Sequence, residues 1–456
     1  MSTPLSTRII QEHVAAAALF PAQVVGGERR ARAMEVLAAR GLPSVRDDNW
    51  KYTNLRALEK VRFAPAAQEV SPAVSVADMP PAIDGYLRFT FVDGVFAPEL
   101  SSDTRHQGVS FRSLRAAPGG TPTGLGGSAG VGSPVGLADA ETQRPSGRFD
   151  PGDERFALLN DAFATDGAAV HVSARTDCPT CLEFVFVARA SSQTAASYPR
   201  LELHVEADAR VGVIERHISV GGEASFVNGS VSVNIGRGAV LNHYRVQQVN
   251  PAALWFDTLK ADISQDGIYQ LRSVNLGGLS ARSTLQIRLA GERAEVGVHV
   301  VSVADHRQVQ DTFVHVDHIA PRTRTEQNFR GIAAGRSRVA FNGKVVVCEG
   351  ANGADSRQSL RGLLAGPEAE IDARPQLEIY TDDVKCSHGA TAGKLDETML
   401  FYLLSRGLER DTAQQLLKWA FLQDIVAKID VPELRRQIEQ SIAGQMQEAT
   451  ALKELL

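Results

Sequence analysis

Cys386 and His388 form a pair whose residue types suit metal chemistry. Only one residue separates them, so in an extended segment they share one face, with Cα atoms roughly 6.5–7 Å apart, while Lys385 and Ser387 point away. A thiolate and an imidazole are both ligands for iron or zinc. Two ligands do not close a metal site, so on spacing alone this pair is weak evidence, and further ligands have to come from elsewhere.

A second pair, Cys178 and Cys181, forms a CxxC motif, which serves in other proteins as a redox pair or as half of a zinc site. The sequence contains no second CxxC and no thioredoxin-like βαβ pattern around this one, and Cys348 lies far away. The simpler interpretation is two small residues at a turn between strands.

The segment His315-Val316-Asp317-His318 resembles a metal-binding motif, but it lies in a stretch with the alternating pattern of a strand. If it is extended, His315 and Asp317 share one face and His318 points to the other. The two histidines could not then chelate one ion without a bulge. We therefore predict a structural or interface role.

Two glycine-rich segments superficially resemble nucleotide-binding motifs. The run from Gly119 to Gly136 follows no clear strand and opens no helix, so it predicts a linker. Residues 389–395 resemble a P-loop but are one residue short, and Leu395 replaces the hydroxyl residue that would hold magnesium. We expect no ATP hydrolysis through a P-loop.

The elements that must position these residues follow from the hydrophobic pattern. Residues 8–60 have helical composition broken at Gly41 and Pro43, and alternation around Asp93-Gly94 predicts a hairpin. Residues 155–380 consist of short alternating segments, which a sandwich, a barrel or a β-helix would all satisfy. We divide the chain into a helical region (1–85), a hairpin and linker segment (86–154), a β core (155–390) and a C-terminal helical domain (391–456).

Length and composition limit the functional classes. The 456 residues carry a net charge of −5, so there is no basic excess and nucleic acid is not a favoured partner. No stretch is apolar and long enough for a membrane span or a secretory signal. Four cysteines are too few for a disulfide framework in a chain of this size, which fits a reducing, cytoplasmic setting.

Several longer motifs resemble one known family. They are residues 377–391 (LEIYTDDVKCSHGAT), 395–396 (LD), 401–407 (FYLLSRG), 48–53 (DNWKYT) and 341–343 (FNG). Together they are similar to the SufB/SufD family, and to its D-type members in particular. Residues 359–364 (SLRGLL) lack the key cysteine of B-type chains, and His388 stands where B-type chains carry a glutamate.

The resemblance implies a mainly β fold, with a right-handed parallel β-helix core flanked by N- and C-terminal helical domains. It implies a non-enzymatic scaffold for iron–sulfur cluster assembly that pairs with SufB through the β-helix and binds the ABC-type ATPase SufC. It assigns His388 and Cys386 to a transient cluster shared with SufB, and it leaves a flavin requirement open.

The C-terminal helices carry apolar faces beside charged rims, and we expect them to dock the ATPase. Candidate contact residues there are Leu400, Phe401, Leu416, Trp419 and Phe421.

The alternative is a β-helical enzyme acting on polysaccharides. Such an enzyme would place several carboxylates or basic residues along an exposed groove, and the sequence contains only scattered Asp and Glu.

Overall fold

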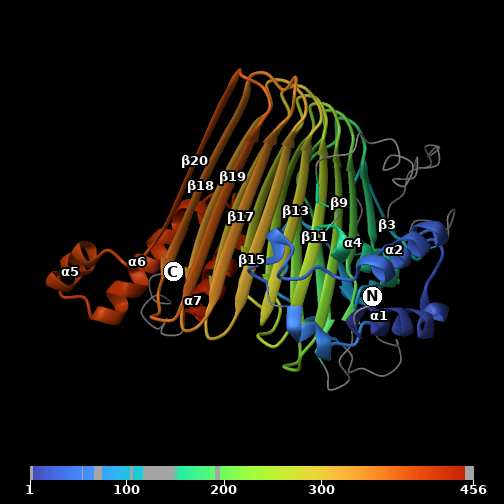
Figure 1. Ribbon diagram of the computed structural model, residues 1–456, viewed down its shortest axis with the longest axis horizontal. Helices are drawn as coiled ribbons and strands as arrows, with labels where there is room; N and C mark the ends of the chain where they lie inside the picture. Colours follow the sequence, from blue (N-terminus) through green and yellow to red (C-terminus); the bar gives the residue numbers. More distant parts are fainter. Residues whose placement is uncertain are drawn as a thin grey trace.

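The chain folds around a β-solenoid of about seven turns, with helices at both ends of the sequence (Figure 1). The computed structural model describes residues 4–53, 55–65, 74–102, 106–116, 149–150, 152–190 and 196–446. The predicted mainly β architecture with terminal helices is thereby confirmed, as a β-helix and not as a sandwich or a barrel. The linker predicted around residues 117–152 lies mostly outside the described residues.

Two sheets form the solenoid, and each turn adds one strand to each sheet. The first contains, in spatial order, β2 (Val95–Phe96), β1 (Leu87–Val92), β5 (Asp177–Arg189), β8 (Arg210–Val220), β10 (Val240–Gln248), β12 (Ile268–Asn275), β14 (Glu295–Ala304), β16 (Arg324–Ala333), β18 (Ala354–Leu364) and β20 (Val384–Gly393). The second contains β19 (Glu370–Ile379), β17 (Arg338–Val347), β15 (Val309–His318), β13 (Ser280–Leu289), β11 (Leu254–Ile263), β9 (Phe226–Ile235), β7 (Arg200–Val205), β4 (Ala168–Val172) and β3 (Val109–Ser113), with β6 (Ala196–Ser197) beside β9.

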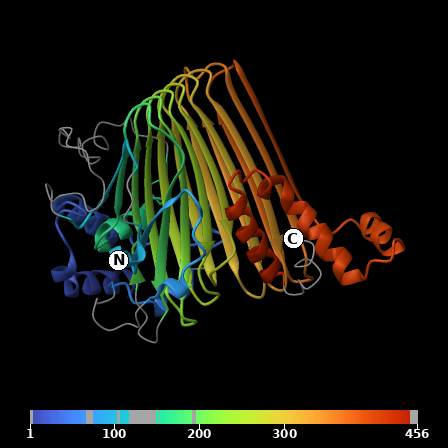
Figure 2. The ribbon, with the colours of Figure 1, turned by 180° about the vertical axis from the view of Figure 1, so that it is seen from behind.

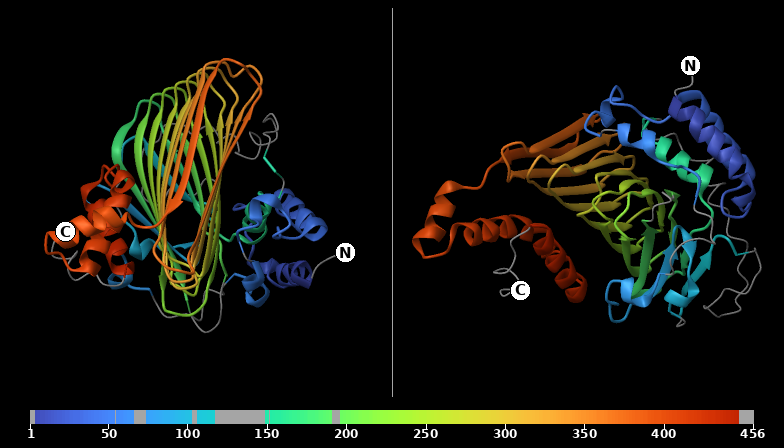
Figure 3. Two further views of the ribbon diagram at one scale, coloured as in Figure 1. Left: turned by 60° about the vertical axis from the view of Figure 1, so that its left-hand side comes forward. Right: turned by 90° about the horizontal axis from the view of Figure 1, so that it is seen from below.

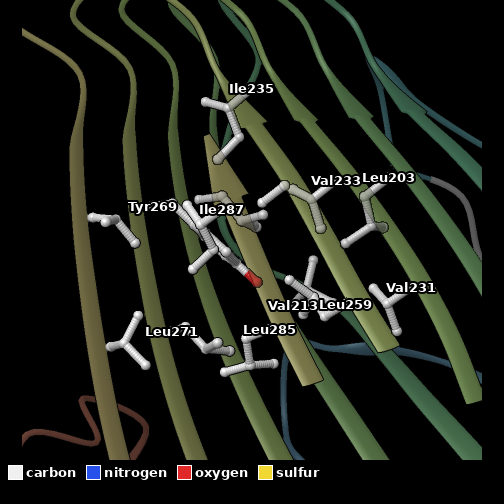
Figure 4. Close-up of a cluster of buried hydrophobic side chains, with 14 of the residues drawn as sticks. Leu203, Val213, Val231, Val233, Ile235, Leu259, Tyr269, Leu271, Leu285 and Ile287 are labelled. Atoms are coloured by element: carbon white, nitrogen blue, oxygen red, sulfur yellow. The ribbon is translucent and has the colours of Figure 1, made fainter. Parts of the chain in front are cut away.

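Alternating residues explain why these segments stack. Val231, Val233 and Ile235 of β9 point into the space between the sheets, where they meet Leu259 and Leu285 of the following turns (Figure 4). Parallel pairing keeps equivalent residues in rows, so inward-facing apolar side chains form one continuous core.

The length of a turn varies along the solenoid. Arg210 pairs with Val240, Ile268 with Glu295, and Arg324 with Asp355. Because the spacing changes from turn to turn, the sequence shows no repeat of fixed period.

Helices cover the outer faces of both sheets, on opposite sides of the solenoid (Figures 2 and 3). On the second sheet lie α1 (Pro4–Ala15), α2 (Gly27–Arg40) and α4 (Arg155–Phe163), which share a core with Phe226, Leu254 and Phe256. On the first sheet lie α6 (Arg410–Val426) and α7 (Pro432–Gln445), which pack on Tyr244 and Ile332. The remaining helix is α5 (Glu397–Ser405), and short 3-10 turns occupy Ala17–Leu19, Asp48–Trp50, Leu55–Lys60, Val76–Asp78 and Pro98–Leu100.

Two local predictions have different outcomes. Strands β1 and β2 form the predicted antiparallel hairpin, and Asp93 and Gly94 at its turn both have positive φ (48° and 83°), as a two-residue turn of this kind needs. Residues 155–163 were expected to begin the β core but form α4, because Phe156, Leu159 and Phe163 recur at helical spacing and pack into the core shared with α1 and α2. Among the described helices, none combines the length and apolar character needed to cross a lipid bilayer.

The interior also contains a buried ionic cluster. Its residues on β8 and β10 continue the inward-facing alternation that begins with Val213 and Leu241. Arg245 donates hydrogen bonds to Glu215 (2.8 and 3.0 Å) and to Asp257 (2.7 Å). His217 and His243 also contact Glu215, at 2.6 and 3.0 Å. Burial opposes ionisation of Glu215, but Arg245 and the two histidines outweigh it and hold the pKa of this carboxyl well below its usual range.

The His315–His318 segment has the extended geometry that its alternation predicts. His315 Nε2 lies 3.0 Å from Asp317 on one face of β15, while His318 lies on the other face. Thr323 donates to the Ala320 carbonyl, so it accepts from His318 Nδ1 (2.8 Å), and Thr325 can then donate to Nε2 (2.8 Å). These contacts satisfy a neutral imidazole, and burial lowers the pKa of His318 to about 4, although Asp317 and Asp355 oppose this shift.

Removing the cation from the buried cluster should be costly. We expect Arg245→Met to lower the free energy of unfolding by about 3–5 kcal/mol, because Glu215 and Asp257 would remain buried without their shared partner. Urea unfolding measures the loss. Arg293→Met, which breaks an exposed pair with Asp266, should change little. Equal losses in the free energy of unfolding of Arg245→Met and Arg293→Met would contradict the argument that a buried ion pair costs more to break than an exposed one.

Stability should also fall in acid because of His318. The unfolded imidazole binds a proton near pH 6.5, whereas the folded one does so only near pH 4, so the unfolded state holds more protons between these values. Stability should therefore decrease as the pH falls from 7 to 4.5. In His318→Gln this decrease should be smaller by up to about 3 kcal/mol. Urea unfolding of both proteins at pH 7 and at pH 4.5 measures this decrease. An equal decrease in His318→Gln and in the parent chain would show that His318 is not its cause.

Candidate functional site

The C-terminal end of the solenoid is open. Strand β19 pairs only with β17 and β20 only with β18 within the described residues, so each is the last strand of its sheet. Figure 1 shows β20 at the outer limit of the solenoid. Both edge strands are ten residues long and carry backbone donors and acceptors that no strand of the described chain uses.

Cys386 and His388 lie side by side on this last strand. Cys386 is in register with Ser356 of β18, and His388 is in register with Gln358. Ser356 and Gln358 are both buried and face the solenoid interior. The register therefore places Cys386 and His388 on one inward face, as their spacing predicts. Because no further turn covers them, Cys386 is half-buried and His388 is exposed.

Polar residues lead up to this pair from the interior. Gln358 donates from Nε2 to the Gly343 carbonyl (3.0 Å) and to Oε1 of Gln327 (3.2 Å). A Cβ at Gly343 would lie 2.8 Å from each amide, so glycine at this position lets both glutamines keep this arrangement. Since Gln327, Gln358 and His388 are in register, the histidine ends a polar row that begins inside the solenoid.

The environment of Cys386 favours the neutral thiol. Burial raises the pKa of Cys386, and the charge of Asp355 adds to the rise, while a backbone hydrogen bond from Ser356 opposes it. Binding of a soft metal would displace the thiol proton, because only the thiolate is a good ligand.

The five candidate docking residues have different environments. Leu400 (1% exposed) and Trp419 (8% exposed) are buried in the chain, and Leu416 and Phe421 are partly buried. Trp419 packs in the core between α6 and the first sheet, and Phe421 lies beside Arg330. Phe401 is 72% exposed.

Two exposed apolar residues near Phe401 were missed in the sequence. Met399 (58% exposed) and Tyr402 (56% exposed) lie on α5 with Phe401, so this short helix exposes three large apolar side chains, which we call the α5 patch. Asp396 caps this helix by accepting from the Thr398 (2.8 Å) and Met399 (3.2 Å) amides. Helix α5 packs against α6 and projects beyond the solenoid (Figures 1 and 3). Adjacent Phe401 and Tyr402 were the available signal, since one of two neighbouring aromatic residues in a short helix is difficult to bury.

The near-P-loop and one cavity in the described part of the chain lack the features of a nucleotide or glycosidase site. Residues 389–393 belong to strand β20, so the near-P-loop has no loop that could cradle phosphates. A cavity of about 710 Å³ lies between strand turns and the end of α7. Its lining among the described residues holds Asp305 as the single carboxylate, beside His306, Arg307 and Arg336, so this cavity lacks the carboxylate pair of most glycosidases.

Comparison with known proteins identifies related sequences. A family model described as "SUF system FeS cluster assembly, SufBD core domain" matches residues 186–421, which include Cys386 and His388. The iron–sulfur cluster assembly protein SufD of Escherichia coli is 29% identical over 89% of this chain and 89% of that protein. A SufBD family protein of Synechocystis, slr0076, is 28% identical over 91% and 90%. The chloroplastic protein ABCI7 of Arabidopsis thaliana is 28% identical over 68% and 67%.

Proposed function

The chain belongs to the SUF-system SufBD core family of iron–sulfur cluster assembly proteins, and we propose that within it the chain acts as a D-type scaffold subunit without a complete enzyme site. It pairs with a SufB-type chain, binds a SufC-type ATPase and contributes to a transient iron–sulfur cluster. The observation that carries this proposal is the placement of Cys386 and His388 together on the open last strand of the solenoid.

The edge strands support pairing with a second β-solenoid. An exposed edge of ten residues binds another strand through backbone hydrogen bonds, and side chains at alternate positions give specificity. Ile379, the last residue of β19, and Tyr380, which follows it, are exposed apolar residues that such a partner would cover. A SufB-type chain with its own open end can satisfy both edges at once.

The same interface would complete a cluster site. A thiolate and an imidazole nitrogen bind iron, but this chain offers only these two ligands on the inward face of β20. The partner therefore supplies the remaining ligands. A cluster held by ligands from two chains can be released when the interface between the chains changes. Such a site suits assembly and transfer of the cluster.

The apolar patch on α5 is the proposed ATPase contact. Met399, Phe401 and Tyr402 are exposed on a helix that projects from the solenoid, and burying them against a partner would remove a substantial apolar area from water. Leu400, on the same helix, is buried within the chain, and Trp419 is buried between α6 and the first sheet.

Removal of the imidazole should reduce cluster formation without preventing assembly. We expect His388→Ala to remain folded, because the side chain is exposed, and to co-purify with its partners while binding little cluster. Cys386→Ala should have a milder effect, because the B-type partner supplies the main thiolate. The measurement is iron and acid-labile sulfide per complex after anaerobic co-expression.

Ser387→Ala is the matched control for His388→Ala, since Ser387 is also exposed on β20 but points to the opposite face. It should retain normal cluster content. A folded His388→Ala complex with normal iron and sulfide would show that this histidine has a purely structural role.

Charges placed on the α5 patch should weaken ATPase binding. We expect Phe401→Asp and Tyr402→Asp each to reduce affinity by about 10- to 100-fold, because each aromatic ring contributes roughly 1.5–3 kcal/mol when buried. Isothermal titration with the purified ATPase measures this effect, and circular dichroism checks the fold. Val14→Asp, an exposed substitution on α1, is the control. Full affinity in both folded α5 variants would refute docking at this patch.

A further inference from the structure

The CxxC motif occupies a β-bulge near the start of β5. Cys178 pairs with Val211 of β8, but the next paired residue, Leu182, faces Val213. Three residues of β5 therefore stand opposite Gly212 alone. A Cβ at Gly212 would lie 1.9 Å from the Pro179 carbonyl oxygen, so the bulge requires glycine on the neighbouring strand. The bulge brings both cysteines into the buried core at this end of the solenoid.

A histidine from a distant part of the sequence joins the two cysteines. His106 lies in the turn before β3, where its carbonyl accepts from the Val109 amide (3.2 Å). A hydrogen bond joins this turn to the segment before β5: the Gly108 carbonyl accepts from the Ser173 amide (2.8 Å). The ligand atoms of His106, Cys178 and Cys181 all lie within 4.8 Å of one another.

This separation suits one small metal ion. Tetrahedral zinc, with bonds of 2.0–2.3 Å to nitrogen and sulfur, holds such ligand atoms roughly 3.5–3.8 Å apart. Small side-chain rotations would therefore bring all three atoms to one ion. Two thiolates and one imidazole form a set that favours zinc over the hard cations magnesium and calcium, and divalent zinc binds such ligands more tightly than ferrous iron does.

A hydrogen bond also sets the tautomer of this histidine. His106 Nδ1 lies 2.9 Å from the Gln107 carbonyl oxygen, which can only accept a hydrogen bond. Nδ1 therefore carries the proton and Nε2 has the free lone pair. Donation from the second ring nitrogen to a carbonyl is the usual outer contact of a metal-bound histidine.

We infer that Cys178, Cys181 and His106 bind one zinc ion, with a water at the fourth position, and that this ion clamps the N-terminal end of the solenoid. The three ligands lie outside the matched residues 186–421 and at the opposite end from Cys386. The site is therefore independent of the proposed cluster function. His106 is half-buried, which gives the ion a route from solvent.

A surface cluster of His171, His204 and Glu206 provides the natural control. Its ligand atoms also lie close together, but Glu206 already accepts from the Ala174 amide (2.8 Å) and contacts His171 Nε2 (3.0 Å). It contains no thiol, so a bound cobalt ion there would lack thiolate-to-metal absorption.

The test uses the full chain with Cys348→Ser and Cys386→Ser, so that Cys178 and Cys181 are its only thiols. The chain is purified without oxygen, depleted of metal and titrated with Co²⁺ and then with Zn²⁺. We expect one equivalent of Co²⁺ with thiolate-to-cobalt charge-transfer absorption, displacement by one Zn²⁺, and a higher melting temperature with Zn²⁺. His106→Ala should weaken Zn²⁺ binding by at least about 100-fold, since even loss of an outer contact costs 10- to 100-fold.

Cys178→Ser and Cys181→Ser should have the same effect, and His204→Ala should leave the affinity and the absorption unchanged. Because both cysteines are buried, circular dichroism checks the fold of these variants, and half-buried His106 keeps the test decisive if they misfold. Absence of thiolate-to-cobalt absorption, unchanged Zn²⁺ affinity in His106→Ala, or a Cys178–Cys181 disulfide in protein kept from oxygen would each overturn the inference.

Discussion

Parallel hydrogen bonding between successive turns is the constraint on which the rest of this structure depends. Each central strand pairs with the strand one turn before it and the strand one turn after it, and the pairing keeps the inward and outward faces in step. Cys386 therefore points inward because it is in register with inward-facing Ser356, and His388 points inward because it is in register with Gln358. The last turn has no following strand to pair with among the described residues. Side chains that can bind a metal and unpaired backbone groups therefore lie together there.

Polar side chains in the solenoid interior need partners for their charges and hydrogen-bonding groups. Glu215, Arg245 and Asp257 are tolerated in the core because their charges are paired within hydrogen-bond distance, and an unpaired buried charge would cost several kcal/mol. Gln327 and Gln358 follow this rule only in part: Gln358 Nε2 donates to Gln327 and to the Gly343 carbonyl, while Gln327 Nε2 and Gln358 Oε1 are buried without a hydrogen bond in the described chain. His388 continues that row without a further turn to supply partners. A second chain at this end would provide what each interior turn provides for its neighbour.

Local patterns predicted much of this arrangement, and contacts between distant residues account for the rest. Alternation in Val231, Val233 and Ile235 was sufficient for the strands, and one-residue spacing placed Cys386 and His388 on one face. The environments of Trp419 and Phe401 were not predictable, because they depend on how α6 packs on the first sheet while α5 stands free of it. Likewise, no spacing rule connects His106 with the CxxC motif, since a turn before β3 brings them together.

The two ends of the solenoid offer different edges. At the first end, Phe89 of β1 stacks on Phe111 of β3, at 4.0 Å between ring centroids, and antiparallel pairing of β1 with β2 and of β3 with β4 interrupts the parallel stack. The edge strands there have two residues (β2) and five residues (β3), whereas both edge strands at the last end have ten, so a partner that extends both sheets would find the longer parallel edges there.

Register at that open end must be controlled, because a slip of one residue would turn Cys386 and His388 away from the shared interior. Residues 389–393 (GATAG) are small and specify register weakly, since they offer little side-chain packing. The larger residues of the first half of β20, together with exposed Ile379 and Tyr380, must then fix the alignment. The residues proposed to recognise the partner and those proposed to bind iron therefore lie on the same short stretch of chain, so in this proposal correct pairing would also complete the ligand set.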